Sequence, residues 1–258
     1  NIVSSNLDGI DLANSNQNKL TGNTASFNGV FNTDAGVGFK LDSSNNNTLS
    51  GNTARQNGTG FQLTGTATGN TLSQNKSISN VANDGFEIDA SGGNSLTSNT
   101  STGDPEGFVV SGGANTLTNN SAANDSGGFE IFSDSNTLKG NVASNNLTSG
   151  FVLEGSDMNV LSGNTANGNG STGIFLMDSN NNTITGNTFK NNGGAGIHAD
   201  HNSDQNTFTS NTATGNGFTA GTFDLEDDTS GGSGTAGTKN TWHKNKATTA
   251  NPIALLTA

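Results

Sequence analysis

The sequence predicts an all-β fold: a single-stranded, right-handed parallel β-helix of about ten coils of roughly 23 residues, with three short strands in each coil. Three observations predict it, namely two recurring phrases and the constant order in which they alternate. The first phrase is Asn-x-Leu-x-x-Asn, and successive copies begin 21 to 34 residues apart. Its copies open at Asn18, Asn47, Asn70, Asn94, Asn115, Asn136, Asn159, Asn182, Asn206 and Asn240.

The second phrase, Gly-Phe-x-Leu, lies between copies of the first. Its aromatic or aliphatic residue stands at Ile10, Phe39, Phe61, Phe86, Phe108, Phe129, Phe151, Ile174, Ile197 and Phe223. Both phrases alternate apolar and polar residues, which is typical of half-buried strands, and clusters of Gly, Asn and Asp supply the turns. Parallel crossovers are right-handed in nearly all proteins, which sets the expected hand. The expected core contains Ala54, Phe61, Leu63, Leu72, Ala166 and Ala213.

The two asparagines of the first phrase keep a constant spacing of five residues in every copy. Asparagine tolerates the left-handed backbone of a sharp turn, and its amide can bond both to its own turn and to the asparagine of the next coil. We therefore expect stacked amide ladders at the corners, with a structural role.

With 28% hydrophobic residues and 37 glycines among 258, the chain also has the composition of a disordered polar segment. Disorder gives no reason for Leu, Phe and Asn to stay in phase, so the repeat favours a packed stack. We expect the β-helix to span residues 1–251 and residues 252–258 to cap its open end. Because residues 1–6 match residues 52–57, the sequence starts within a repeat, and we expect an N-terminal part or a further domain before it.

Charge and composition exclude several partners. The chain has 9 basic and 21 acidic residues, a net charge of −12 and a single arginine, Arg55, which argues against nucleic acid. The same imbalance disfavours polyanions unless metal ions bridge them. No run of residues is apolar and long enough to span a membrane, and the absence of cysteine excludes disulfides and thiolate metal sites.

The pattern G-[IF]-x-L followed by N-x-[LI]-x-x-N resembles the right-handed parallel β-helix repeats of the NosD-like family, which are related to carbohydrate-binding and sugar-hydrolase solenoids. The resemblance covers the whole chain. The ending Asn240-Thr241-Trp242 and then Asn251-Pro252-Ile253 is similar to the C-terminal closure of such proteins. This resemblance implies a bacterial or archaeal protein that is secreted, periplasmic or at the cell surface and that contacts a polysaccharide or cell-surface glycan, although a repeat identifies a fold and not a reaction.

Chemistry is expected on the outward positions of the Gly-Phe strand. Strand geometry places His198 and Asp200 ~6.6–7 Å apart, with Asp224 and Glu226 ~4.8 Å away on the next coil. Carboxylates this close shift each other's pKa, and such spacing is used by glycosidases. The catalytic candidates are Glu154, His198, Asp200, Asp224 and Glu226.

The same region suggests two binding roles. Oxygen and imidazole ligands at Asp200, His201, Asp227 and Asp228 could hold calcium, and no other cofactor is indicated. Phe132, Phe175 and Met177 form an outward apolar strip on which a sugar ring could stack. An exposed apolar strip also suits a contact with another subunit or a further domain.

These features favour a glycan-binding or rigid interaction module over an enzyme. The first alternative is a polysaccharide hydrolase or related carbohydrate-active enzyme that uses the acidic cluster. Lyase or epimerase chemistry is disfavoured, because the chain has no tyrosine, one arginine and no outward lysine beside that cluster. The second alternative is ice binding through threonine ranks on the Asn-x-Leu strand, interrupted by Lys139 and Val160.

Overall fold

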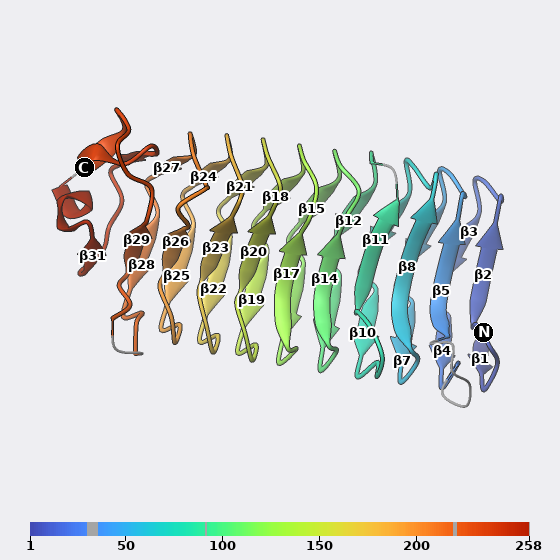
Figure 1. Cartoon of the computed structure of the whole chain (residues 1–258). Coiled ribbons are helices and arrows are strands. Elements are labelled where there is room, and N and C mark those ends of the chain that lie inside the picture. The colour runs from blue at the N-terminus through green and yellow to red at the C-terminus, as the bar shows by residue number, and fades with distance from the viewer. Residues whose placement is uncertain (30–35, 91, 219–220, 258) are drawn as a thin grey trace.

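The computed structural model describes residues 1–29, 36–90, 92–218 and 221–257. It confirms an all-β, right-handed parallel solenoid of about 10 coils of ~23 residues, with almost no helix in the described parts. Figure 1 shows the coils stacked in chain order, so that the N-terminal coil and the C-terminal segment lie at opposite ends. The described residues form three parallel sheets, of 11, 10 and 10 strands, which run along the stack.

The phenylalanine sheet is built from the Gly-Phe strands. Its register aligns Phe61 with Phe39 and Phe86, and their rings stack with centroids 4.9 Å and 4.7 Å apart. Each such stacked pair contributes about 0.5–1.5 kcal/mol beyond area burial. The strands are β2 (Ile10–Ala13), β5 (Val37–Asp42), β8 (Thr59–Gly65), β11 (Phe86–Ala90), β14 (Glu106–Val110), β17 (Gly127–Ile131), β20 (Phe151–Glu154), β23 (Ile174–Met177), β26 (Ile197–Ala199), β29 (Leu225–Asp227) and β31 (Ala250–Asn251).

The leucine sheet is built from the Asn-x-Leu strands. Leu49 and Leu72 are register partners, and both are fully buried, as expected. At the C-terminal end the Phe208 ring stacks on Trp242 at 4.0 Å. The strands are β3 (Lys19–Thr21), β6 (Thr48–Ser50), β9 (Thr71–Ser73), β12 (Ser95–Thr97), β15 (Thr116–Thr118), β18 (Thr137–Lys139), β21 (Val160–Ser162), β24 (Thr183–Thr185), β27 (Thr207–Thr209) and β30 (Thr241–His243).

The alanine sheet supplies small inward side chains. Ala54, Ala166 and Ala213 are fully buried, which confirms their expected place in the core. Small residues here leave room for the phenylalanine stack. The strands are β1 (Ile2–Ser4), β4 (Thr24–Ser26), β7 (Thr53–Arg55), β10 (Lys76–Ile78), β13 (Thr100–Thr102), β16 (Ser121–Ala123), β19 (Val142–Ser144), β22 (Thr165–Asn167), β25 (Thr188–Lys190) and β28 (Thr212–Thr214).

Buried asparagines form the ladders that the spacing predicts. In the regular rungs the backbone N and the Nδ2 of one asparagine both donate to the Oδ1 of the next, whereas the Nδ2 of Asn115 and of Asn136 bonds within its own turn. Asn47 bonds Asn70 in this way at 2.8 and 3.1 Å, and Asn52 bonds Asn75 at 2.9 and 3.0 Å. A third ladder, which the sequence reasoning missed, runs five residues after the second and includes Asn57. A complete rung satisfies buried polar groups that would otherwise cost about 1–3 kcal/mol each.

The C-terminal end is covered by short segments rather than by another full coil. The 3₁₀ helices are η1 (Thr235–Gly237) and η2 (Ile253–Thr257), and Leu255 of η2 is fully buried against the core. The helix η2 lies beyond β31 at the end of the stack (Figure 1). The described residues include no helix long and apolar enough to cross a membrane. The sequence between Asn28 and Gly38 is longer than in other coils and predicts an enlarged loop, of which residues 30–35 lie outside the described residues.

Candidate functional site

The outward face of the phenylalanine sheet carries the groups that could act on a ligand. The residue after each inward aromatic or aliphatic side chain points outward, and the register stacks these residues into a row. In the C-terminal half this row contains Glu130, Val152, Phe175, His198 and Glu226, one from each successive coil. Because the inward residues are locked in the core, the row is held on a rigid support.

His198 lies between an aromatic ring and two carboxylates. Its ring stacks on Phe175 with centroids 4.9 Å apart and planes inclined by 30°. Its Nε2 is 3.0 Å from Asp228 Oδ2, and its Nδ1 is 3.8 Å from Glu226 Oε2. Burial raises the pKa of Glu226, His198 lowers it, and the Asp228 carboxylate raises it again. Both imidazole nitrogens therefore face acceptors.

The expected register of the last coil is wrong by two residues. We expected Phe223 to face the core opposite Ile197, with Asp224 beside His198. Instead Leu225 pairs with Ile197, and Glu226 pairs with His198. The physical reason is that Asp224 stands opposite Gly196, at the bend where other coils carry glycine, and it serves there as a hydrogen-bond acceptor.

Asp224 is therefore an internal acceptor and not an outward catalytic group. It is 1% exposed, and its Oδ1 accepts from the backbone N and the Nδ2 of Asn216, both at 3.0 Å. Its Oδ2 accepts from the backbone N of Thr248 at 2.9 Å and of Thr249 at 3.2 Å. Burial raises its pKa, but these hydrogen bonds outweigh burial and hold the pKa below its usual range.

Asp227, expected to ligate a metal, is also buried. It is 4% exposed, and its Oδ2 accepts from the Trp242 indole Nε1 at 2.7 Å. Its Oδ1 accepts from the Thr229 hydroxyl at 2.6 Å, and both carboxylate oxygens accept from Asn240 Nδ2 at 3.2 Å. The inward position and the indole bond explain why this carboxylate is not available to a solvent-borne ion.

The remaining metal candidates do not converge. Asp200 Oδ1 accepts from the Ser203 hydroxyl at 2.7 Å and from the Asn202 backbone N at 3.1 Å, so it closes its own turn. His201 is exposed. Across the described ranges, no group of three or more His, Cys, Asp or Glu side chains could hold a metal ion.

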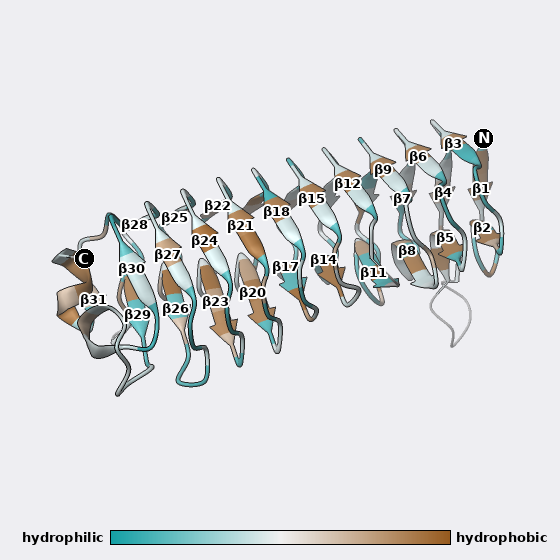
Figure 2. Cartoon of the chain, turned by 90° about the horizontal axis from the view of Figure 1, so that it is seen from above, coloured by the Kyte–Doolittle hydropathy of each residue, from teal (hydrophilic) through white to brown (hydrophobic). Residues whose placement is uncertain are grey.

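The apolar strip lies where it was expected. Val152 pairs with Phe175, and Glu154 pairs with Met177 in the neighbouring outward row. Phe132 precedes Glu154 in that row and is 39% exposed. Strands β20 and β23, which carry Val152, Phe175 and Met177, are mostly brown in the hydropathy colouring of Figure 2. Four apolar side chains thus surround one exposed carboxylate.

A second acidic group, which the sequence did not single out, lies on β14 and β17 and on and just before β11. Asp84 and Glu106 each precede an inward phenylalanine by two residues, while Glu87 and Glu130 belong to the outward row. We call these four residues the groove acids. Burial raises the pKa of Asp84 to about 7, and Glu87, Glu130 and Asp104 add to the shift. Burial likewise raises the pKa of Glu106 to about 7, with Glu130, Asp84 and Asp125 adding.

Glycine makes room for one of these acids. Glu106 pairs with Gly127, and its Oε2 lies 1.8 Å from where a Cβ on that glycine would stand. The same oxygen is buried and has no hydrogen-bond partner. The glycine opposite an acidic residue was the available sequence signal, because other coils place larger residues at this position.

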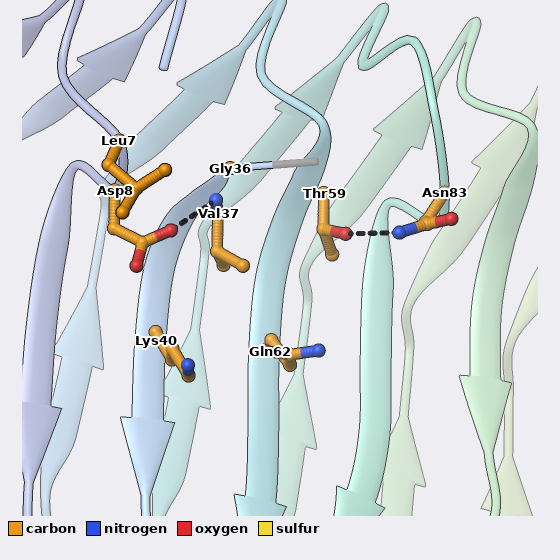
Figure 3. Close-up of a pocket in the computed structure, with 8 residues that line it drawn as sticks. All are labelled: Leu7, Asp8, Gly36, Val37, Lys40, Thr59, Gln62 and Asn83. Carbon is orange, nitrogen blue, oxygen red and sulfur yellow. Dashed lines mark hydrogen bonds between the residues drawn. The ribbon is translucent and has the colours of Figure 1, made fainter. Parts of the chain in front are cut away.

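A pocket of about 210 Å³ opens near the N-terminal end of the same face. Figure 3 shows its polar lining, in which Asp8 Oδ1 accepts from the Val37 backbone N at 2.8 Å and Asn83 Nδ2 donates to the Thr59 hydroxyl at 3.3 Å. The lining residues are Leu7, Asp8, Gly36, Val37, Lys40, Thr59, Gln62 and Asn83. The sequence did not single it out, since its walls come from several coils.

Comparison with known families decides the classification. The family model described as periplasmic copper-binding protein (NosD) matches residues 75–254, and the model of the right-handed β-helix region matches residues 1–122. The chain belongs to the NosD family. No curated protein sequence matches it.

Solved structures similar to this NosD-family chain share its fold at low sequence identity. The mannuronan C-5 epimerase AlgE6 A-module of Azotobacter vinelandii has 16% identity and a TM-score of 0.78 over 94% of this chain and 72% of that chain. The periplasmic alginate epimerase AlgG has 16% identity and a TM-score of 0.70, over 91% of this chain and 60% of that one. The GH87 α-1,3-glucanase of Streptomyces thermodiastaticus has 15% identity and a TM-score of 0.56, over 96% of this chain and 64% of that one.

The copper named in the family description does not fit the described residues. Protein copper sites are built from thiolate, thioether and imidazole ligands. The chain has no cysteine and three histidines, of which His198 already faces two carboxylates while His201 and His243 are exposed. Because no group of three or more His, Cys, Asp or Glu side chains converges in the described ranges, we assign no role to copper.

Proposed function

We propose that this NosD-family chain binds a glycan along the outward face of the phenylalanine sheet. The observation that carries the proposal is the apolar strip of Phe132, Val152, Phe175 and Met177 around Glu154. Apolar and aromatic side chains stack on the faces of sugar rings, while carboxylates accept hydrogen bonds from hydroxyl groups. A rigid strip needs little ordering on binding, which lowers the entropic cost.

The ligand class is also suggested by the similar folds. Their titles name alginate epimerases, an α-1,3-glucanase and a tailspike protein in complex with a pentasaccharide. These names describe those proteins, and at 11–16% identity they support only the choice of polysaccharide as ligand class. The periplasmic description of the family favours a periplasmic, secreted or cell-surface location, and fractionation of expressing cells tests this placement.

We prefer binding without turnover. Asp224, a member of the expected acidic cluster, and Asp227, a predicted metal ligand, both accept internal hydrogen bonds. His198 is held between two acceptors, and the strip itself offers one carboxylate, Glu154, among apolar groups.

A polysaccharide hydrolase is the second candidate, and the groove acids favour it. A carboxyl group whose pKa is about 7, such as that of Asp84 or Glu106, is half protonated at neutral pH and can donate a proton to a leaving group. Neighbouring carboxylates at Glu87 and Glu130 would supply the second group that glycoside hydrolysis needs.

A glycan array combined with a reducing-sugar assay tests both candidates. The wild type is compared with Phe175→Ala, Glu106→Gln and Glu226→Gln, and with Phe27→Ala as the control for an exposed aromatic at the corner after β4. Binding that Phe175→Ala alone weakens, without release of reducing ends, supports the binding role. Release of reducing ends that Glu106→Gln abolishes supports the hydrolase. Absence of both binding and release contradicts both.

A further inference from the structure

The third amide ladder has two consecutive rungs of aspartate where the coils on either side carry asparagine. Asp104 and Asp125 are each 3% exposed. In an asparagine rung the side chain both donates and accepts: Asn57 donates to Asn80 Oδ1 from its backbone N at 2.9 Å and from its Nδ2 at 3.2 Å. A carboxylate can accept in this arrangement, but it has no Nδ2 donor to pass on.

Asp104 is satisfied as an acceptor. Its Oδ1 accepts from the backbone N and the Nδ2 of Asn80 at 2.7 and 2.9 Å, and its Oδ2 accepts from the Ser101 hydroxyl at 2.6 Å. Its backbone N donates to Asp125 Oδ1 at 2.8 Å. The side-chain donor that an asparagine would add to this rung is missing.

The side chain of Asp125 has an oxygen without a hydrogen-bond partner. Its backbone N donates to Asn146 Oδ1 at 3.0 Å, but its Oδ2 is buried and has no hydrogen-bond partner. The corresponding side-chain atom of Asn169, two coils on, is an Nδ2 that donates to the next rung at 2.9 Å. A proton on Asp125 Oδ2 would supply the missing donor and complete the rung.

The surroundings disfavour two negative charges at this corner. The carboxylates of Asp104 and Glu106 lie close enough to Asp125 to repel it, and Asp84 acts on Asp104 and Glu106 in the same way. The ion pairs of the described chain involve His198 and Lys239, which belong to coils far along the stack. Burial raises the pKa of Asp125 to about 7, although the hydrogen bond from the Asp104 backbone N lowers it. Burial also raises the pKa of Asp104, which hydrogen bonds from Ser101 and Asn80 lower.

Asp224 shows what a carboxylate in the same ladder looks like when it is satisfied. It ends the ladder, so no onward donor is required, and donors from Asn216, Thr248 and Thr249 surround both of its oxygens. Its pKa is lowered, in contrast to that of Asp125. The position of a carboxylate within the ladder, rather than its burial alone, decides whether it must hold a proton.

We propose that Asp104 and Asp125 form a proton-operated latch, in which a proton on Asp125 supplies the side-chain donor that its rung lacks and loss of this proton to water leaves two adjacent buried carboxylates that loosen this corner. The latch adjoins the outward face, because Pro105 alone separates Asp104 from Glu106. Loosening this corner of the coil would therefore change the positions of the groove acids. This inference stands independently of the proposed glycan role.

The direction of the pH effect follows from linkage. A carboxyl whose folded-state pKa lies above its unfolded value binds protons more tightly in the folded state, so its contribution is fully present below the unfolded pKa and is lost as pH rises through the folded pKa. For Asp125 this window runs from the ordinary aspartate value of 3.8 up to about 7. The folded chain should therefore lose stability as pH rises through this window.

The decisive variant is Asp125→Asn, which restores the side chain used by the neighbouring rungs. Thermal midpoints are measured from pH 5 to pH 8 for the wild type, Asp125→Asn and Asp104→Asn, with the exposed Asp89→Asn as control. We expect the thermal midpoint of Asp125→Asn to exceed that of the wild type by an amount that grows with pH. The difference in midpoint between Asp89→Asn and the wild type should stay the same at every pH. If the thermal midpoint depends on pH equally in the wild type, Asp125→Asn and Asp104→Asn, the latch proposal is wrong.

A measurement on the unmodified chain keeps the proposal testable if a variant fails to fold. The side-chain carboxyl ¹³C resonance of Asp125 should titrate with a midpoint near 7, as should line broadening at the Asp104 and Asp125 amides. A carboxyl resonance that titrates near the ordinary value of 3.8 would show a charged Asp125 at neutral pH and contradict the latch.

Discussion

The ring of Phe175 stacks on the imidazole of His198 one coil further along, with centroids 4.9 Å apart, and His198 Nε2 in turn lies 3.0 Å from Asp228. This contact joins the apolar strip to the carboxylates at the C-terminal end of the same face. A ligand lying along the phenylalanine sheet would therefore meet apolar and charged groups in sequence.

Removing the aromatic ring should weaken binding more than folding. Phe175→Ala deletes a half-buried outward ring and leaves the inward stack untouched, so we expect affinity for the glycan to fall about two- to twelvefold, corresponding to about 0.5–1.5 kcal/mol. Isothermal titration with the oligosaccharide selected on the array measures the change. The control Phe27→Ala, at the corner that follows β4 of the alanine sheet, should retain the wild-type affinity. An equal loss in both variants would contradict the assignment of the site to the phenylalanine sheet.

The amide ladders should be a main source of stability. Asn120 is fully buried, and its Nδ2 donates to Leu96 O at 2.9 Å and to Asn141 Oδ1 at 3.1 Å. Asn120→Ala should lower the free energy of unfolding by about 2–4 kcal/mol, because partners on both sides lose hydrogen bonds. Urea unfolding measures this loss. The exposed Asn167→Ala should change it by less than about 0.5 kcal/mol, and a similar effect of both variants would argue against the ladder.

The variant Asp227→Asn tests whether this carboxylate stabilises the fold or binds a metal ion. Asp227→Asn places an amide nitrogen where the Trp242 indole and Asn240 both donate, so we expect a loss of about 1–3 kcal/mol in stability. Thermal unfolding with calcium and with a chelator provides the measurement. The loss should be the same under both conditions. A loss seen only when calcium is present would restore the ligand interpretation.

Removing the charge of one of the groove acids should stabilise the folded chain at high pH. The folded-state pKa of Glu106 is raised to about 7, so its contribution is present at low pH and disappears as pH rises from about 4.5 through about 7. Glu106→Gln removes the charge, and its midpoint of thermal unfolding should exceed that of the wild type at pH 8 by more than at pH 5. The exposed Glu154→Gln serves as control and should show no such difference. Indistinguishable pH profiles for Glu106→Gln and the wild type would refute the assignment.

The fold could be predicted because the repeat constrains it at every coil. Leu72 and Phe61 return at fixed positions, and no other architecture keeps both in phase with the asparagines. The third ladder was equally visible, since Asn57, Asn80 and Asn146 each follow the second ladder by five residues, but it lies outside the phrases that define the strands.

The site was harder to predict because it depends on local departures from the repeat. Asp224 occupies a position that glycine holds elsewhere, and this shifts the following strand by two residues. A register shift of two residues leaves the same residues of the strand facing inward and outward. The pattern of apolar and polar side chains therefore does not reveal the shift. The groove acids were missed because Asp84 and Glu106 precede the strand phrase, and their burial depends on neighbours in other coils.

The most direct test of the account uses the fact that the chain has no cysteine. Single cysteines are placed at the outward positions Val152 of the phenylalanine sheet, Thr118 of the leucine sheet and Ser144 of the alanine sheet, and each is coupled to a bulky maleimide before glycan binding is measured. We predict that modification at position 152 abolishes binding while modification at positions 118 and 144 leaves it unchanged. Binding that survives modification at 152 but is lost at 118 or 144 would contradict the central claim.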